Sequence, residues 1–238
     1  MAKKVTSRKK SPIKSRRKRW PMRILARGLL SFAGAIIISV GLFSIIPPPT
    51  TPYVLSEGLR LGSLRRTWVP IDVVSPVAVR SVVAAEDANF CLHWGFDMGQ
   101  LRAAIAEGAD RGASTLTQQT VKNVWLWPGR SWPRKALEAV MTPAVEALWT
   151  KRRIVEVYLN VAEFDEGVFG IEAAAQHHFG VPASELSARQ AGLLAAVLPN
   201  PKKRQAVNPS AFVDRRARSI VDGAATIRAD GRAACFED

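Results

Sequence analysis

One apolar run near the N-terminus constrains this chain more than any other feature. Residues 28–46 are nineteen residues without a charge, just enough for a helix to cross a hydrocarbon core of about 30 Å. Residues 1–27 carry twelve Lys and Arg and no acidic residue, an asymmetry that predicts a cytoplasmic N-terminus. The run ends in Pro47-Pro48-Pro49 and not at a small-residue cleavage site. It therefore predicts an uncleaved membrane anchor and not a signal peptide.

The distribution of charge also excludes a nucleic-acid-binding protein. The formal net charge is +14, but the first 27 residues supply twelve of these charges and leave only +2 for the rest. A nucleic-acid site would carry its charge on a folded domain, whereas here it lies on a polar tail that cannot bury a core. We expect the tail to be cytoplasmic and everything from Pro47 onward to be outside the cytoplasm.

The two cysteines, Cys91 and Cys235, would then lie in an oxidising compartment, where a disulfide is permitted. They are far apart in the sequence, and Cys235 falls in a C-terminal segment that we expect to fray. The sequence therefore leaves open whether they pair. Neither cysteine has the spacing of a metal-thiolate site, and the sequence predicts no metal ligand.

The remainder of the chain is typical of an all-α protein. A stiff spacer at 47–52 and irregular or short extended structure over 53–70 precede it, so we expect a linker at 47–66 and a domain at 67–238. Apolar spacing and capping signals predict helices over 75–86, 97–109, from 114 or 115 onward, and over 134–149, 151–160, 171–178, 187–198 and 208–227. Pro143 predicts a kink. Hairpin signals and alternating strands are absent from the sequence.

Two adjacent carboxylates, Glu86 and Asp87, begin the first segment that can carry chemistry. They end an apolar helix and open into a loop with Phe90, His93 and Trp94. Burial beside aromatic rings would raise the pKa of a carboxyl towards the range of a general base. Taken alone, however, the composition favours a solvated helix end.

A second segment, residues 111–123, leads from small residues into a polar helix start. Free amides and hydroxyls at such a start can bind an anion or sugar hydroxyls. Ser114, Gln118 and Lys122 follow one another at four-residue steps on one face. Thr115 and Gln118 have the spacing of a capping box, so capping and a surface face explain the pattern as well as ligand binding does.

A third segment, residues 128–138, gathers cations around one carboxylate. The cluster consists of Arg130, Arg134, Lys135 and Glu138. It suits an anionic substrate, since a hydrogen bond to a charged group contributes about 1.5–3 kcal/mol, although an ordinary ion-pair face is the alternative. Nearby Trp125, Trp127 and Trp132 favour contact with a membrane interface.

Two later segments, 151–160 and 167–180, are interpreted as structural. Glu156 and Asn160 share a helix face, and we expect Glu156 to be buried against Arg152 or Arg153. Small residues at the start of the second segment indicate close approach of the backbone to a neighbour.

The order and spacing of these five segments resemble the peptidoglycan glycosyltransferase family. The motifs are EDxxFxxHxG from Glu86, GASTxTQQxxKN from Gly112, RKxxE from Arg134, KxxIxExYLN from Lys151 and GxxGxEAAAxxxFG from Gly167. One motif is unspecific, but five in order over about residues 67–208 are specific. The resemblance is to monofunctional members, because the part after residue 208 has no SxxK motif and no room for a transpeptidase domain.

The resemblance implies a role for each matching residue. Glu86 would be the catalytic base that deprotonates the acceptor 4-hydroxyl, and Glu138 would assist the leaving undecaprenyl pyrophosphate. The cations around that pyrophosphate would be Lys122, Arg130, Arg134 and Lys135. The polar residues of the donor site would be Ser114, Thr115, Gln118 and Gln119.

The resemblance also implies the fold and the partners. We expect a lysozyme-like helical head, a smaller membrane-associated jaw and one transmembrane helix in the inner membrane, with the domain periplasmic. The partners would be lipid II, the growing lipid-linked strand, membrane lipids and divisome or elongasome proteins, with no nucleic acid. The resemblance implies no required cofactor. It leaves open whether a divalent cation such as Mg²⁺ or Mn²⁺ binds at the pyrophosphate.

The chain departs from the family pattern at two places. His178-Phe179-Gly180-Val181 stands where YFGK is usual, and Gln190 replaces a usual Glu. Neither departure touches the residues expected to perform acid–base chemistry, so they bear on local packing.

Two other functions compete with strand polymerisation. A lytic or hydrolytic enzyme of lysozyme type also uses two carboxylates on a helical domain, but it has no anionic leaving group for the cations between Lys122 and Lys135 to bind. A non-catalytic cell-wall scaffold would not need all five motifs. The sequence therefore favours the polymerase.

Overall fold

The computed structural model describes residues 20–108, 114–129 and 131–237, and its chain divides into two compact units, Met1–Ser39 and Val40–Asp238. Helix α1 (Trp20–Phe43) supplies the described part of the first unit. Its stretch Arg23–Phe43 is long and apolar enough to cross a membrane, with a mean hydropathy of 1.9. The exposed large apolar side chains of this unit include Ile24, Leu25, Leu30, Phe32, Ile37 and Ile38. A helix therefore exists where the sequence predicts an anchor, and it begins and ends earlier than residues 28–46.

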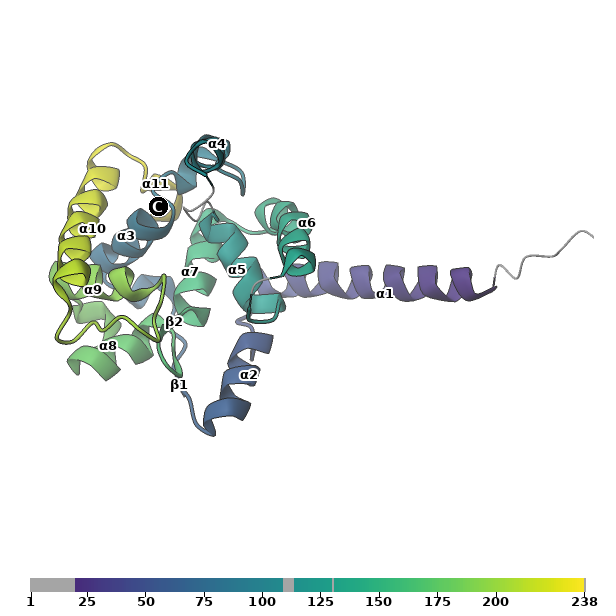
Figure 1. The fold of residues 1–238 in the computed structure, drawn as a ribbon, viewed down its shortest axis with the longest axis horizontal. Helices are drawn as coiled ribbons and strands as arrows, with labels where there is room; N and C mark the ends of the chain where they lie inside the picture. The colour runs from purple at the N-terminus through teal and green to yellow at the C-terminus, as the bar shows by residue number, and fades with distance from the viewer. Residues whose placement is uncertain (1–19, 109–113, 130, 238) are drawn as a thin grey trace, which may run out of the picture. The chain divides into compact units, whose positions relative to one another are not determined.

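The second unit is predominantly helical, as predicted (Figure 1). Its helices are α2 (Pro52–Leu61), α3 (Pro76–Glu86), α4 (Met98–Ala106), α5 (Leu116–Trp125), α6 (Trp132–Leu148), α7 (Lys151–Val161), α8 (Ile171–Phe179), α9 (Ala188–Val197), α10 (Ala211–Ala229) and α11 (Ala234–Glu237). Three short 3₁₀ turns join them at Ile71–Val73, Phe90–Leu92 and Ala183–Glu185.

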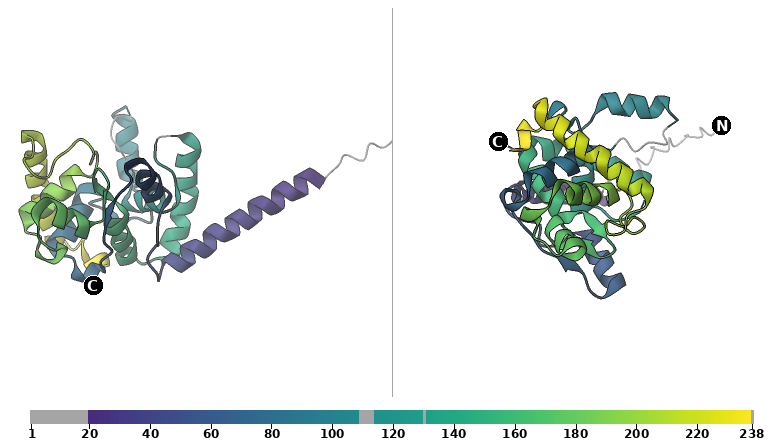
Figure 2. Two further views of the ribbon diagram at one scale, coloured as in Figure 1. Left: turned by 90° about the horizontal axis from the view of Figure 1, so that it is seen from below. Right: turned by 90° about the vertical axis from the view of Figure 1, so that its left-hand side faces the viewer.

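Helices α3, α9 and α10 pack on one another and form one side of the core. Figure 2 shows α10, in yellow, as the long helix along that side. The crossing of α9 and α10 requires a glycine, because a Cβ on Gly192 would come within 2.7 Å of the Ala217 carbonyl oxygen. Helix α7 lies in the interior, with Ile154 and Leu159 fully buried, and packs against α5.

Side-chain caps set several helix starts where the sequence predicts them. Thr115 and Gln118 form a complete capping box at α5, and Ser187 and Gln190 form another at α9. Gln190 therefore performs the capping function that a Glu would perform at the same position. The helix predicted over residues 208–227 exists as α10 but begins later, because Ser210 caps it and Asn208 has a positive φ of 54°.

The prediction of irregular or short extended structure over residues 53–70 is wrong up to Leu61, where helix α2 ends, and is confirmed beyond it. Thr51 caps α2, Pro52 occupies its first turn, and Gly62 ends it in the left-handed conformation. Beyond it, β1 (Arg65–Arg66) pairs with β3 (Val168–Phe169), which pairs with β2 (Glu163–Asp165). These strands have no signal in the sequence, because two- and three-residue strands are too short to show an alternating pattern.

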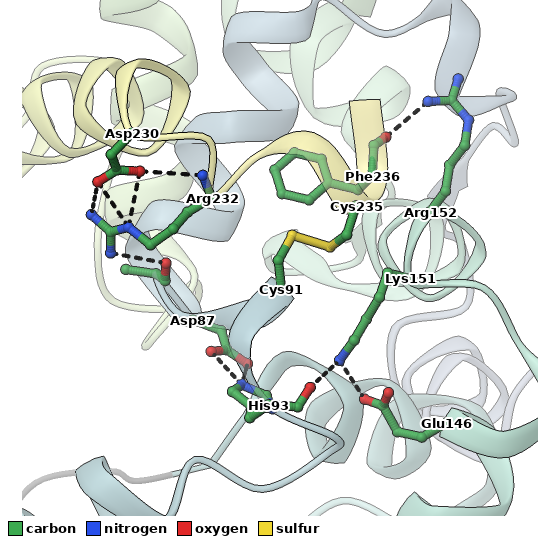
Figure 3. The surroundings of a disulfide bond; sticks show 11 residues. Asp87, Cys91, His93, Glu146, Lys151, Arg152, Asp230, Arg232, Cys235 and Phe236 are labelled. Atoms are coloured by element: carbon green, nitrogen blue, oxygen red, sulfur yellow. Dashed lines mark hydrogen bonds and ion pairs between the residues drawn. A yellow bond between two sulfur atoms is a disulfide. The ribbon is translucent and has the colours of Figure 1, made fainter. Parts of the chain in front are cut away.

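The C-terminal segment was predicted to fray, and this prediction is wrong. Cys235 lies in α11 and forms a disulfide with Cys91, 144 residues earlier (Figure 3). Phe236 is 1% exposed, and its carbonyl accepts a hydrogen bond of 2.8 Å from Arg152. Local sequence did not reveal this pairing, because the two cysteines are brought together by contacts of α11 with α7 and with the turn at Phe90–Leu92, which are far from α11 in the sequence.

Candidate active site

Glu86 ends α3 and is not a solvated helix end. Gln119 donates a hydrogen bond of 2.8 Å to its Oε2 atom, whereas Oε1 is buried and has no hydrogen-bond partner among the described residues. Tyr158 of α7 in turn donates to Oε1 of Gln119 at 3.2 Å. This bond orients the Gln119 amide so that its nitrogen faces Glu86. The result is a fixed carboxylate with one unoccupied acceptor oxygen.

Electrostatics around Glu86 act in two directions. Burial raises the pKa of Glu86, and the Gln119 hydrogen bond and the charges of Arg216, Lys122 and Arg204 oppose that rise without cancelling it. Desolvation favours the protonated form of a carboxyl. The group is therefore a better proton acceptor, once ionised, than an exposed glutamate.

Glu86 lines a cavity of about 600 Å³. Its polar and charged lining comprises Glu86, Gln100, Glu107, Ser114, Gln119, Arg204 and Arg216. Arg204 follows α9, and Arg216 lies in α10. Both are functional candidates that the sequence did not indicate. Their only local signal is two short basic runs at 202–204 and 215–218, and the packing of α10 on α3 brings Arg216 to the cavity.

Glu138 of α6 is the second buried carboxylate, with 3% of its surface exposed. Arg134 forms an ion pair with its Oε1 atom, and Lys135 lies 3.0 Å from its Oε2 atom. Lys135 also donates to the hydroxyl of Ser114 at 2.8 Å. Helical spacing of three and four residues places both cations on the same face as Glu138, which positions them and offsets part of their charge.

Lys122 lies on α5, and the charges of both Glu86 and Glu138 act on its ammonium. Burial lowers its pKa, while the charges of Glu138 and Glu86 raise it. Its backbone carbonyl accepts a hydrogen bond from Leu126, but its side-chain ammonium has no hydrogen bond or ion pair with a described residue. With Arg134 it lines a second cavity of about 260 Å³. An ammonium in this position is available to an anionic ligand.

The other predicted donor-site residues have structural partners. Gln118 accepts from the Thr115 backbone N–H at 3.1 Å, and the Thr115 hydroxyl donates to the Gly95 carbonyl at 2.7 Å. Their role in substrate binding stays a prediction. Arg130 lies outside the described residues.

Asp87 fixes the loop that follows Glu86. It accepts hydrogen bonds from His93 at 2.9 Å and from the Leu116 backbone N–H at 2.9 Å, which joins the end of α3 to the start of α5. Figure 3 shows His93 beside Asp87, with Lys151 donating to the His93 carbonyl. These contacts hold the loop that follows Glu86 against the start of α5.

The two segments interpreted as structural have that role in the described structure. Arg153 pairs with Glu156, and Asn160 bonds with both backbone groups of Val69 at 2.9 Å. Gly170 has a φ of 88°, and a Cβ there would lie 3.2 Å from the Asn160 carbonyl oxygen. Close backbone approach therefore requires this glycine.

Comparison with known proteins shows the family of this chain. Residues 55–225 match the family model described as transglycosylase. The chain is 60% identical to the biosynthetic peptidoglycan transglycosylase of Jannaschia sp. (strain CCS1), with 99% of each chain covered. It is 47% identical to the protein of the same name from Rhodospirillum centenum, over 91% of this chain and 97% of the relative, and 44% identical to that of Caulobacter vibrioides, over 89% and 94%. The chain belongs to the transglycosylase family.

Proposed function

We propose that this chain polymerises peptidoglycan glycan strands from lipid II. The observation that carries the proposal is the buried Glu86 carboxylate at a large cavity, with Oε2 held by Gln119 and Oε1 without a partner among the described residues. A carboxylate held in this way can remove a proton from a bound hydroxyl. Family membership and the names of the relatives supply the substrate class.

In the proposed reaction, Glu86 accepts the proton of the 4-hydroxyl of the acceptor N-acetylglucosamine. The oxygen forms a bond to C1 of the N-acetylmuramic acid at the end of the growing strand. The bond from C1 to the pyrophosphate oxygen breaks, and its electron pair leaves with undecaprenyl pyrophosphate. Attack from the opposite face inverts the anomeric carbon from α to β, and the contact of Tyr158 with Gln119 keeps the base aligned.

The cations of α5 and α6 would bind the departing pyrophosphate. Lys122 and Arg134 share one cavity, and Glu138 holds Arg134 and Lys135 in place. Each charge-assisted contact contributes about 1.5–3 kcal/mol. Both Glu138 oxygens have cationic partners, so a divalent cation, if one takes part, would be held mainly by the substrate's phosphates.

A hydrolytic function is not favoured by this arrangement. Cleavage of a glycosidic bond in a finished strand releases a neutral alcohol, which gives Lys122, Arg134 and Lys135 no charge to stabilise. A scaffold without catalysis would not need a desolvated carboxylate beside a cavity, because burying that group costs folding free energy.

The proposal includes a position at the outer face of the inner membrane. Trp127, Trp132, Val140 and Leu148 expose large apolar surfaces around α6, which suits a jaw that contacts lipid. The disulfide supports an oxidising compartment for the domain. The basic tail would then be cytoplasmic, with lipid II reached from the membrane and divisome or elongasome proteins as further partners.

The test is incubation of the purified chain with lipid II, followed by gel separation of the products. We expect long uncross-linked strands and released undecaprenyl pyrophosphate from the wild type, while preformed strands stay intact. Glu86→Gln should polymerise at least 10²-fold more slowly, as loss of a general base predicts, and Arg189→Ala, which removes an exposed ion pair with Asp214, should match the wild type. Shortening of preformed strands would contradict the proposal.

A further inference from the structure

A cluster of two imidazoles and one carboxylate lies outside the Glu86 cavity. Asp165 ends β2, and His177 and His178 lie in the last turn of α8, which packs against β2. Oδ2 of Asp165 is 3.4 Å from Nε2 of His177 and 3.7 Å from Nε2 of His178. One ligand atom from each residue lies within 4.8 Å of the other two.

His178 has a buried nitrogen without a hydrogen-bond partner among the described residues. Its side chain is 6% exposed, and within the described residues Nε2 makes no hydrogen bond, because 3.7 Å is too long for one. A neutral imidazole that carries its proton on Nδ1 has its lone pair on Nε2, the arrangement typical of histidine metal ligands.

Asp165 is oriented in the complementary way. Its Oδ1 atom accepts a hydrogen bond of 2.8 Å from the Glu166 backbone N–H, and its Oδ2 atom faces the two imidazoles. The side chains of Asp165 and His177 are 36% and 33% exposed, so an ion and a water ligand can enter from solvent. One side of the cluster is therefore fixed and the other is open.

The two separations from Asp165 to the imidazoles fit a small tetrahedral ion. Zinc binds His nitrogen and carboxylate oxygen at about 2.0–2.2 Å, which separates neighbouring ligand atoms by about 3.4 Å. The 3.4 Å separation needs no movement, and the 3.7 Å separation needs a few tenths of an ångström. Two imidazoles and a carboxylate suit zinc and similar first-row metals, whereas calcium and magnesium prefer oxygen ligands.

We propose that Asp165, His177 and His178 bind one zinc ion, which joins the β2–β3 hairpin to the end of α8. None of the three residues lines the cavity that contains Glu86. The ion therefore stabilises the folded domain by binding the native state, and it takes no part in glycosyl transfer.

A second cluster, Asp87, His93 and Asp97, provides the matched control. Here both carboxylates and one ring nitrogen already have partners: Asp87 accepts from Nε2 of His93 and from Leu116, and Asp97 accepts from Gln100 and Asn89. Only Nδ1 of His93 is buried with no hydrogen-bond partner among the described residues. His93 is also the only histidine outside the proposed site. Loss of this residue should leave zinc binding unchanged.

The experiment uses the full chain in detergent, without a histidine tag and after removal of metals with EDTA. Titration with Co²⁺ should produce the visible absorption of a tetrahedral site at one equivalent, and Zn²⁺ should abolish it. His178→Gln and Asp165→Asn should each weaken Co²⁺ binding at least tenfold, while His93→Gln binds as the wild type does. Added Zn²⁺ should raise the melting temperature of the wild type and not of the His178→Gln variant.

Three results would overturn the proposal: a wild type that binds no Co²⁺, variants of Asp165 and His178 that bind as tightly as the wild type, or loss of binding only in His93→Gln. Circular dichroism checks that each variant is folded, and Asp165→Asn changes the surface end of the site if the His178 variant fails that check. Lipid II polymerisation should proceed without metal at this site, so this test and the test of function fail independently.

Discussion

At the residue scale, the site depends on a carboxylate held in a costly environment. Burial raises the pKa of Glu86, so the folded state disfavours its ionised form. A group with a raised folded pKa stabilises the protein fully only below its unfolded pKa, and this contribution is lost as pH rises through the folded pKa. Catalysis and stability therefore make opposite demands on this residue.

We expect Glu86→Gln to stabilise the domain near neutral pH while abolishing activity. The neutral amide keeps the size of the side chain and removes the buried charge, so the melting temperature should rise by about 2–4 °C. The advantage should disappear near pH 4, where Glu86 itself is protonated. Calorimetry at both pH values checks this, and a variant less stable than the wild type at neutral pH would contradict it.

Lys122 makes the clearest prediction for the donor side. Lys122→Ala should reduce kcat/KM for lipid II at least tenfold, because one contact to pyrophosphate is lost, worth about 1.5–3 kcal/mol. Removing a partly desolvated ammonium should not destabilise the fold. Steady-state kinetics combined with melting curves separate the two effects, and unchanged kinetics would move the pyrophosphate elsewhere.

At the scale of elements, the C-terminal segment holds the loop that follows the catalytic base. Cys235 is bonded to Cys91 of that loop, and Arg232 donates to the Ala88 carbonyl at 3.2 Å. Figure 3 shows the bond between Cys235 and Cys91 and the hydrogen bond from Arg152 to Phe236. The last helix therefore supports the site without lining its cavity.

Removal of this disulfide should lower the free energy of unfolding by about 2–4 kcal/mol, because a long loop of the unfolded chain is no longer closed. Urea unfolding of Cys91→Ala/Cys235→Ala should match that of the reduced wild type and should not respond to dithiothreitol. Equal stability of oxidised and reduced wild type would show that packing of α11 alone secures the C-terminus.

At the scale of the whole molecule, the candidate anchor helix and the disulfide fit the proposed topology. A reporter fused after Asp238 should be active only if it is a type that functions after export, because the proposed topology keeps the basic tail in the cytoplasm. A fusion from which the anchor has been deleted should give the opposite result with the same reporters. Activity of a reporter that works only in the cytoplasm would overturn both the topology and the access to lipid II.

The sequence by itself determined the features that depend on neighbouring residues. Helical periodicity, the capping boxes at Thr115 and Ser187, the spacing of Glu138 from Arg134 and Lys135, and the apolar N-terminal run are all local, since they involve residues a few positions apart. The five motifs also indicated the family, because their order can be recognised in the sequence without knowledge of the fold.

Only the tertiary structure decided which distant groups meet. Arg204 and Arg216 at the Glu86 cavity, the Tyr158–Gln119–Glu86 series, the Cys91–Cys235 bond and the cluster of Asp165 with His177 and His178 join residues from separate elements. Helix α2 and the three short strands were missed for a related reason. Their stability comes from packing and pairing across the domain, which a local pattern of apolar residues does not record.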